Sequence, residues 1–295
     1  MPSFCLSTKE VPVPDGTTLN LLHSPSDVAP DAPVIVCVPA MGAAARYYEP
    51  LLRALCTSGL NAAAFDLRGN GDSSVRASRA IDFGYNEILT RDFPCAIQEA
   101  ARIFPRCPIV ILGHSLGGQL ACLYAAAAGE RIAGLILVAS GSVYYRSWAF
   151  PWSWLVLFFT GAARIIAEIV GYFPGREFGF GGREARRVMR DWSAQARTGR
   201  YQVSSSVIDF DSLLATTAKP VLAITLCGDR LAPHAAVQHL CAKMVRAKTE
   251  HRCVKIVGGR RRAHFRWVGK PGAIIPHVLR WLADVVPAFD VGQAS

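Results

Sequence analysis

The segment that most constrains the fold of this chain is an apolar run, Pro108–Leu112, followed at once by the sequence G-H-S-L-G at residues 113–117. The pattern predicts a strand that turns sharply into a helix and holds the hydroxyl of Ser115 above the edge of a sheet. The two glycines have a steric reason, because a side chain at either position of so tight a turn would collide with neighbouring backbone. We interpret the segment as a nucleophile elbow, and the alternative is an ordinary glycine-rich turn.

The rest of the chain alternates short apolar runs with longer segments of helical periodicity, which indicates an α/β fold with a mostly parallel sheet flanked by helices. Most of these runs are continuously apolar, as is typical of strands that are buried on both faces. Strands are predicted at Leu19–His23, Val34–Val38, Asn61–Phe65, Pro108–Leu112, Ile132–Ala139, Pro220–Leu226 and Arg252–Val257. Helices are predicted at Arg46–Thr57, Asn86–Ile103, Leu116–Ala128, Pro233–Arg246 and Pro271–Val286.

The alternation stops between residues 143 and 214, where no core strand is expected. We interpret residues 143–214 as a helical cap, inserted after the strand that follows the elbow helix, into a core formed by residues 1–142 and 215–295. The cap contains a Trp- and Phe-rich stretch, Trp148–Phe159. Its uncharged length falls short of the about 20 residues that a membrane-spanning helix needs. The sequence therefore favours a buried or interfacial cap helix and leaves open whether the tryptophans belong to the core or face lipid.

A serine hydroxyl becomes a good nucleophile only when a base takes its proton and a third group orients that base. The elbow arrangement supplies these groups in the chain order serine, acid, histidine. Asp229 follows the predicted strand Pro220–Leu226 and precedes a proline that opens a helix, so its carboxylate should lie at the carboxyl edge of the sheet. Asp209 and Asp211 precede that strand and are weaker candidates. The alternative role for Asp229 is that of an acid at a helix N-terminus.

Of the histidines that follow Ser115, only His264 lies between the last predicted strand and the last predicted helix. From that loop a side chain can reach the serine, so we assign His264 the role of base. The neighbouring Arg260–Arg262 would disfavour its imidazolium form if they pointed inward. The remaining candidates lie in the helix after Asp229, just before the last strand and in the last helix: His234, His239, His251 and His277.

Acyl transfer also needs backbone N–H groups that meet the negative charge on a carbonyl oxygen. The N–H of Leu116, directly after the serine, should be one of them. The other is expected in the loop after the strand Val34–Val38, where we choose the N–H of Met41. The glycine- and aspartate-rich segment at residues 66–73 is expected to be a compact structural loop.

Charge and cysteine content indicate which kinds of partner and cofactor to expect. The formal net charge is +10, and arginines are concentrated near residues 183–200 and 260–262. Because no nucleic-acid motif accompanies them, we interpret them as a solvated face and expect no nucleic-acid partner. The nine cysteines are scattered without a C-x-x-C pair, which favours reduced thiols in a cytoplasmic protein over a disulfide framework or a zinc site. The first 16 residues lack the apolar segment of a signal peptide, and we expect neither a metal nor an organic cofactor.

Together these segments resemble the α/β-hydrolase family over most of the chain outside the cap. Residues 66–73 are similar to its D-x-R-G-x-G-x-S segment and residues 113–118 to its G-H-S-x-G-G elbow. The P-A-M-G at residues 39–42 is similar to that of a group of uncharacterised predicted hydrolases, as are H-F-R-W at 264–267 and the cap segment 171–176. Many relatives carry His-Gly where this chain has Pro39-Ala40. This departure affects the expected geometry of the oxyanion loop and not the three catalytic side chains. The resemblance implies an α/β-hydrolase fold and a serine hydrolase.

The leading hypothesis is a serine hydrolase that cleaves an ester or thioester, as carboxylesterases, lipases and thioesterases do, through Ser115, His264, Asp229 and an acyl-enzyme. The aromatic cap favours a small-molecule substrate with an apolar acyl group, and transient contact with a membrane surface is a further expectation. Two alternatives stay open. One is an acyltransferase, which differs in how well the cap excludes water. The other is a non-catalytic binding protein built on the same fold.

Overall fold

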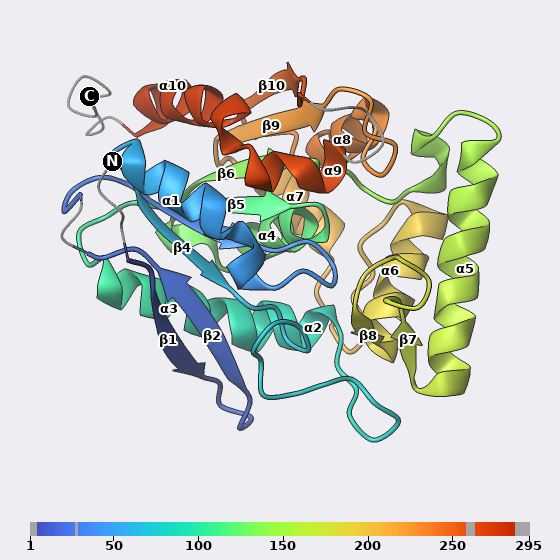
Figure 1. Cartoon of the computed structure of the whole chain (residues 1–295). Coiled ribbons are helices and arrows are strands. Elements are labelled where there is room, and N and C mark those ends of the chain that lie inside the picture. The colour runs from blue at the N-terminus through green and yellow to red at the C-terminus, as the bar shows by residue number, and fades with distance from the viewer. Residues whose placement is uncertain (1–4, 27–28, 258–262, 287–295) are drawn as a thin grey trace.

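The computed structural model describes residues 5–26, 29–257 and 263–286, and an eight-stranded sheet runs through its centre (Figure 1). The strand order is β1-β2-β4-β3-β5-β6-β9-β10. From β4 to β10 all neighbours are parallel, whereas β1 and β2 add an antiparallel edge. The strands are β1 (Ser7–Pro12), β2 (Thr18–His23), β3 (Val34–Val38), β4 (Asn61–Phe65), β5 (Ile109–His114), β6 (Ile132–Val138), β9 (Val221–Leu226) and β10 (Thr249–Val254).

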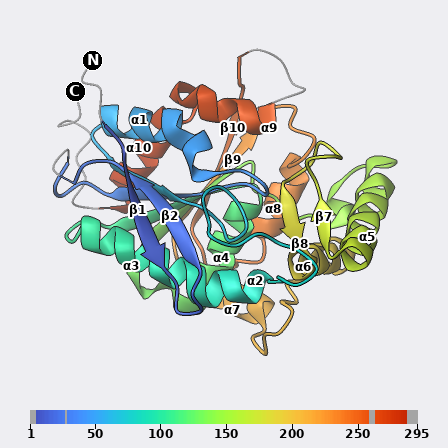
Figure 2. The same cartoon turned by 60° about the horizontal axis from the view of Figure 1, so that its bottom comes forward.

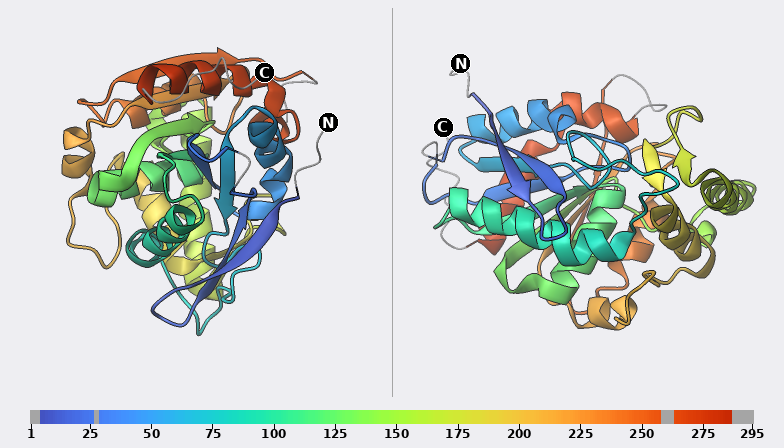
Figure 3. Two further views of the ribbon diagram at one scale, coloured as in Figure 1. Left: turned by 90° about the vertical axis from the view of Figure 1, so that its left-hand side faces the viewer. Right: turned by 90° about the horizontal axis from the view of Figure 1, so that it is seen from below.

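Helices cover both faces of this sheet, with α1 and α10 on one face and α3 and α4 on the other (Figures 2 and 3). The outer helix α10 buries an apolar stripe at helical spacing with Val278, Trp281 and Leu282, whereas α4 is buried continuously from Leu116 to Ala125. The helices are α1 (Glu49–Thr57), α2 (Tyr85–Glu87), α3 (Phe93–Ile103), α4 (Leu116–Ala128), α5 (Trp152–Val170), α6 (Arg186–Thr198), α7 (Phe210–Thr216), α8 (His234–Cys241), α9 (Ala263–Arg266) and α10 (Ile275–Val285).

The predicted α/β architecture is confirmed, most closely in the middle of the sheet. The elements β3, β4 and α4 have the predicted bounds, and every residue of β3 and β4 is buried. The prediction missed β1, because most of its residues are exposed and it carries no apolar pattern. It also placed the last strand three residues too late, so His251 lies inside β10 rather than before it. At the edge of a sheet, backbone pairing extends a strand past its apolar residues.

Residues 143–214, the predicted cap, lie beside the carboxyl edge of the parallel strands, on the right in Figure 1. They contain α5 and α6, which pack against each other, and a short antiparallel hairpin of β7 (Tyr172–Pro174) and β8 (Arg183–Ala185) that the sequence did not predict. The last helix of this stretch, α7, packs against α4 of the core. Several of the cap arginines are in ion pairs rather than simply solvated. Arg187, for example, pairs with Asp82 and Glu87.

Within the described residues, α5 is the helix that is long and apolar enough to cross a membrane by length and composition, with a mean hydropathy of 1.6 over 18 residues. Only 17% of that window is buried, so α5 is not a core helix, and of the buried and interfacial alternatives that the sequence left open the buried one does not hold. It includes Arg164 and Glu168. The helix instead packs one face on the cap and leaves the other face open to the surroundings.

The loop at residues 66–73 has the structural role expected of it. The Asp66 carboxylate accepts hydrogen bonds from the N–H of Ala45 at 2.7 Å and of Asp72 at 2.8 Å. Arg68 is buried and forms ion pairs with Asp92 at 2.5 Å and with Asp15 at 2.7 Å. Burial raises the pKa of Asp92 to about 6 even though the Arg68 guanidinium opposes that shift. These bonds tie the loop after β4 to α3 and to the β1–β2 turn.

Candidate active site

Ser115 lies at the point where β5 turns into α4, with backbone angles of φ 54° and ψ −120° that L-residues rarely adopt. The glycines around it leave no room for side chains. A Cβ on Gly113 would overlap the backbone of Gly118, and a Cβ on Gly117 would overlap the carbonyl oxygens of Val38 and Pro39. The steric reason inferred for the two glycines of the G-x-S-x-G pattern is therefore confirmed, and the turn is a strained strand-to-helix elbow.

Asp229 and His264, the predicted acid and base, lie next to each other. Nδ1 of His264 is 2.7 Å from Oδ2 of Asp229, and the two residues are 6% and 7% exposed respectively. The other carboxylate oxygen of Asp229 accepts hydrogen bonds from the N–H groups of Leu231 at 2.9 Å and Ala232 at 3.3 Å. A carboxylate held in this way fixes the imidazole in the tautomer with a proton on Nδ1, which leaves Nε2 free to accept one.

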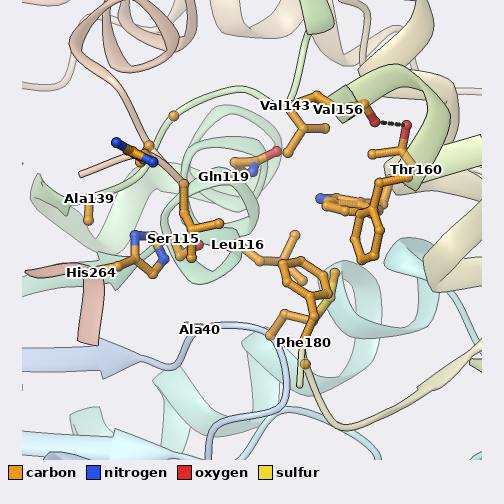
Figure 4. A pocket seen from close by; sticks show the side chains of 18 of the residues that line it. Ala40, Ser115, Leu116, Gln119, Ala139, Val143, Val156, Thr160, Phe180 and His264 are labelled. Atoms are coloured by element: carbon orange, nitrogen blue, oxygen red, sulfur yellow. Dashed lines mark hydrogen bonds between the residues drawn. The ribbon is translucent and has the colours of Figure 1, made fainter. Parts of the chain in front are cut away.

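Ser115 and His264 line the same cavity of about 170 Å³, and Figure 4 shows the His264 ring beside the Ser115 side chain. The two residues are far apart in the sequence: Ser115 lies at the elbow and His264 in the short helix α9 after β10. The sequence placed His264 in a loop, and the helical turn is a small correction. The flanking Arg260–Arg262 lie outside the described residues.

The weaker candidates are engaged elsewhere. Asp209 caps α7 by accepting from the N–H of Ser212, and Asp211 pairs with Lys243 at 2.6 Å. His239 lies 2.7 Å from the hydroxyl of Ser142. The remaining histidine candidates lie in α8, in β10 and in α10: His234, His251 and His277.

The two residues whose backbone N–H groups are predicted to receive an oxyanion line the same cavity as the serine. Leu116 is the first residue of α4, where unpaired N–H groups and the helix dipole favour negative charge. Met41 lines the cavity from the loop after β3. The neighbouring Ala40 N–H donates to the Tyr48 hydroxyl at 2.9 Å, so it is already in use. The assignment of Met41 and Leu116 to an oxyanion hole stays a prediction.

A buried network behind the histidine was not found from the sequence. The Tyr48 hydroxyl accepts from Ala40 and lies 2.7 Å from Nδ1 of His114. The His114 ring in turn lies 5.0 Å from the His264 ring, centroid to centroid. Burial, and then the adjacent His264, hold the pKa of His114 well below its usual value, so this ring is neutral. The network joins the loop before Met41 to the base, and nothing in the local sequence of Tyr48 marks it.

The cap closes the cavity with apolar side chains. Phe159 of α5 packs on Phe180 with ring centroids 5.0 Å apart, and Phe180 packs on Trp192 of α6 at 5.4 Å. Val156 on the same face of α5 also lines the cavity, and Figure 4 shows Phe180 on the cap side of it, opposite Ser115. The substrate space between elbow and cap is therefore mostly apolar.

A cap loop rests directly on the predicted oxyanion loop. A Cβ on Gly42 would overlap the backbone of Gly181 and Gly182. Below this contact lies Glu184, fully buried, whose carboxylate accepts from the Gly182 N–H at 2.8 Å. Burial raises the pKa of Glu184 to about 7, although the bonds from Gly182 and Asn70 act in the opposite direction.

No group of three or more His, Cys, Asp or Glu side chains that could hold a metal is found in residues 5–26, 29–257 and 263–286. All nine cysteines are free thiols. Two of them, Cys227 and Cys253, nevertheless bring their sulfurs within 2.8 Å of each other across β9 and β10, a pairing that the scattered sequence positions did not predict.

Comparison with known proteins places the chain among hydrolases. The family model described as serine aminopeptidase, S33, matches residues 29–195. A putative carbamate hydrolase RutD from Variovorax paradoxus is 32% identical over 122 residues, 41% of each chain. The human monoglyceride lipase is 33% identical over 92 residues, 31% of this chain and 29% of the lipase. The chain thus matches less than half the length of these curated relatives.

Solved structures share the fold at low identity. An esterase from Pyrococcus furiosus superposes with a TM-score of 0.61 at 15% identity, covering 96% of this chain and 92% of the esterase. The protein Est1E from Butyrivibrio proteoclasticus, solved with ferulic acid, gives a TM-score of 0.63 at 16% identity and covers 93% and 99% of the two chains.

Proposed function

The chain belongs to the serine aminopeptidase S33 family of α/β hydrolases, and from this premise we propose that it is a serine hydrolase that cleaves an ester or thioester bond. One observation carries the proposal: a buried Asp229–His264 hydrogen bond of 2.7 Å opens onto the same cavity as a serine held on a strained elbow. Esterases and a lipase among the similar proteins support the choice of ester chemistry.

In the proposed reaction, Oγ of Ser115 attacks the acyl carbon while Nε2 of His264 takes the hydroxyl proton. Asp229 orients the ring and stabilises the imidazolium that forms. The N–H groups of Met41 and Leu116 receive the charge that develops on the carbonyl oxygen. His264 then protonates the leaving alcohol or thiol, water attacks the acyl-enzyme with His264 as base, and Ser115 is restored as the acid departs. These steps use no metal and no organic cofactor.

The proposed substrate is a small molecule with an apolar acyl group of medium or greater length. The support is the cavity wall formed by Val156, Phe159, Phe180 and Trp192, since an alkyl chain gains free energy as it displaces water from such a surface. A panel of p-nitrophenyl esters and acyl-CoA thioesters of increasing chain length tests this. Activity confined to acetyl compounds would contradict an apolar acyl site.

The catalytic assignment is tested with a fluorophosphonate probe. We expect the wild type to be labelled and Ser115→Ala not to be. His264→Ala should lower kcat/KM by about 10³-fold or more. The matched variants His277→Ala and His251→Ala, on α10 and β10, should change it little. A folded wild type that takes no label would favour the non-catalytic binding protein. Preferential transfer of the acyl group to an added alcohol in place of water would favour the acyltransferase.

We further propose that the outer face of α5 contacts a membrane surface during turnover. Trp154, Phe158, Ile165 and Ile169 recur at spacings of four and seven, which puts them on one face, and all four are exposed. The opposite face of the same helix lines the cavity through Val156, Phe159 and Thr160. Exposed apolar side chains that gather on one face of a helix are typical of sites that contact a membrane or another protein.

The occupant we propose for this face is a bilayer with anionic headgroups, because cations flank it. Arg230 stacks over the Trp152 ring at 5.3 Å, and Arg146 is exposed next to the start of the helix. The formal net charge of +10 also attracts the chain to an anionic membrane surface.

Co-sedimentation with phosphatidylglycerol vesicles tests the contact. The double variant Phe158→Ser and Ile169→Ser should lose at least about fivefold in affinity. The control Val245→Ser, equally apolar and exposed but distant in sequence from α5, should lose nothing. Equal binding by the three proteins would refute the contact.

A further inference from the structure

A buried amide side chain lies in the mostly apolar wall of the cavity without taking part in the proposed mechanism. Gln119 lies on α4, one helical turn beyond Ser115, and is only 2% exposed, yet it lines the cavity. Figure 4 shows its amide between Ser115 and Val143. A buried amide among apolar groups costs free energy unless both of its ends have partners.

The oxygen end of the amide has a partner. The Tyr201 hydroxyl donates to Oε1 of Gln119 at 3.1 Å, and Tyr201 is itself 3% exposed. A buried phenol needs an acceptor for its proton, and Gln119 is the acceptor found for it within the described part of the chain. Burial raises the pKa of Tyr201 well above its usual value, so the proton stays on the hydroxyl. This assigns the amide oxygen to Tyr201 and leaves the Nε2 donors for the cavity.

Thr160 carries a hydroxyl on the cap side of the cavity, and that hydroxyl already has an acceptor for its proton. Thr160 donates within its own helix, to the carbonyl oxygen of Val156 at 2.8 Å. It therefore has no proton left for a ligand. Trp192 and the exposed Arg230 also bring N–H groups to the cavity, from α6 and from the loop after β9, whereas Gln119 lies on the helix of the serine itself, one turn beyond it.

We infer that Nε2 of Gln119 forms a polar subsite that binds an oxygen on the acyl group close to its reacting carbonyl, as in a 3-hydroxyacyl or 3-oxoacyl ester. Residues one helical turn apart have Cβ atoms about 5–6 Å apart, so the donor reaches the first carbons of the chain and not its far end. The remainder of the acyl group lies against the aromatic wall. This inference rests on the proposed function, which it deepens by naming the substrate class.

The experiment compares kcat/KM for the p-nitrophenyl esters of 3-hydroxyoctanoate, 7-hydroxyoctanoate and octanoate. In the wild type the 3-hydroxy ester should be preferred over octanoate, and the 7-hydroxy ester should not. The variant Gln119→Leu keeps the volume and removes the donor, so the preference should fall by about 3- to 10-fold, as expected for one hydrogen bond. Thr160→Val, on the opposite wall, should keep the wild-type preference.

A second variant separates a donor from an acceptor. Gln119→Glu replaces the N–H groups by a carboxylate oxygen, so it should lose the preference for the 3-oxooctanoate ester over octanoate, because a ketone oxygen accepts hydrogen bonds and cannot donate one. If Gln119→Leu retains the wild-type preference while all esters are still hydrolysed, the subsite is refuted and the hydrolase stands.

If no ester is hydrolysed, the proposed function fails, and calorimetry tests the subsite by itself. The Ser115→Ala variant should bind 3-hydroxyoctanoate about 3- to 10-fold more tightly than octanoate. Equal affinities would overturn the inference.

Discussion

Replacing Glu184 by glutamine should stabilise this protein at alkaline pH and much less at acidic pH. The Glu184 carboxylate is fully buried under the contact between the cap loop and Gly42, where burial raises its pKa from 4.5 to about 7. A group whose pKa is raised in the folded state supports folding fully below its unfolded pKa. That contribution is lost as the pH rises from 4.5 through 7, since the unfolded chain then releases the proton more readily.

The magnitude follows from the same two values. At about 1.36 kcal/mol for each unit of pKa difference, ionising Glu184 costs about 3 kcal/mol of folding free energy once the pH exceeds 7. Glutamine keeps an acceptor for the Gly182 N–H and never ionises. Between pH 5 and pH 8 the Glu184→Gln variant should therefore gain about 2–3 kcal/mol relative to the wild type.

Urea unfolding at pH 5 and pH 8 measures this difference. The matched control is Glu177→Gln, in the same cap loop but exposed, which should show no pH-dependent gain. If Glu184→Gln changes the free energy of unfolding equally at both pH values, then Glu184 is ionised in the folded protein at pH 5, and the reasoning from burial is wrong.

Three further predictions concern the elbow, the buried ion pair and the tyrosine network. Gly117→Ala should abolish turnover because the added Cβ would overlap two carbonyl oxygens. The control Gly161→Ala, in open space on α5, should keep turnover and raise the free energy of unfolding by about 0.5–1 kcal/mol. Asp92→Ala should lower the free energy of unfolding in urea by about 3–5 kcal/mol because it leaves Arg68 buried with a weakened set of partners; a loss under 1 kcal/mol would contradict this. Tyr48→Phe should lower kcat by about tenfold with little change in KM, since it frees the Ala40 N–H beside the oxyanion loop; an unchanged kcat would show that the network has no positioning role.

The local chemistry of the sequence was enough to identify the centre of the fold. Continuous apolar runs located β3 and β4, and the glycine spacing located the elbow, because burial on both faces and a tight turn each restrict the residue types at their own positions. The order serine, acid, histidine was enough to select Asp229 and His264, and the structure brings those two side chains within 2.7 Å of each other.

Edges and exposed faces were not determined in this way. The strand β1 and the β7–β8 hairpin are held by backbone hydrogen bonds, which any side chain permits, so their sequences carry little signal. The stretch Trp148–Phe159 was equally compatible with a core helix and a lipid-facing helix. Apolar composition shows that exposing these side chains to water is unfavourable. It does not show whether other residues of the fold or a lipid surface cover them.

The finer features of the site required the tertiary structure because each joins residues that are distant in the chain. Tyr48 meets His114, Gln119 meets Tyr201, and the cap loop meets Gly42. A hydrogen bond depends on distance and direction in space, which a one-dimensional pattern does not contain. The sequence by itself determined that a strained serine, an acid and a histidine exist at one edge of an α/β sheet. Only the packing of the cap decided which buried groups face that serine, and which side of α5 remains uncovered.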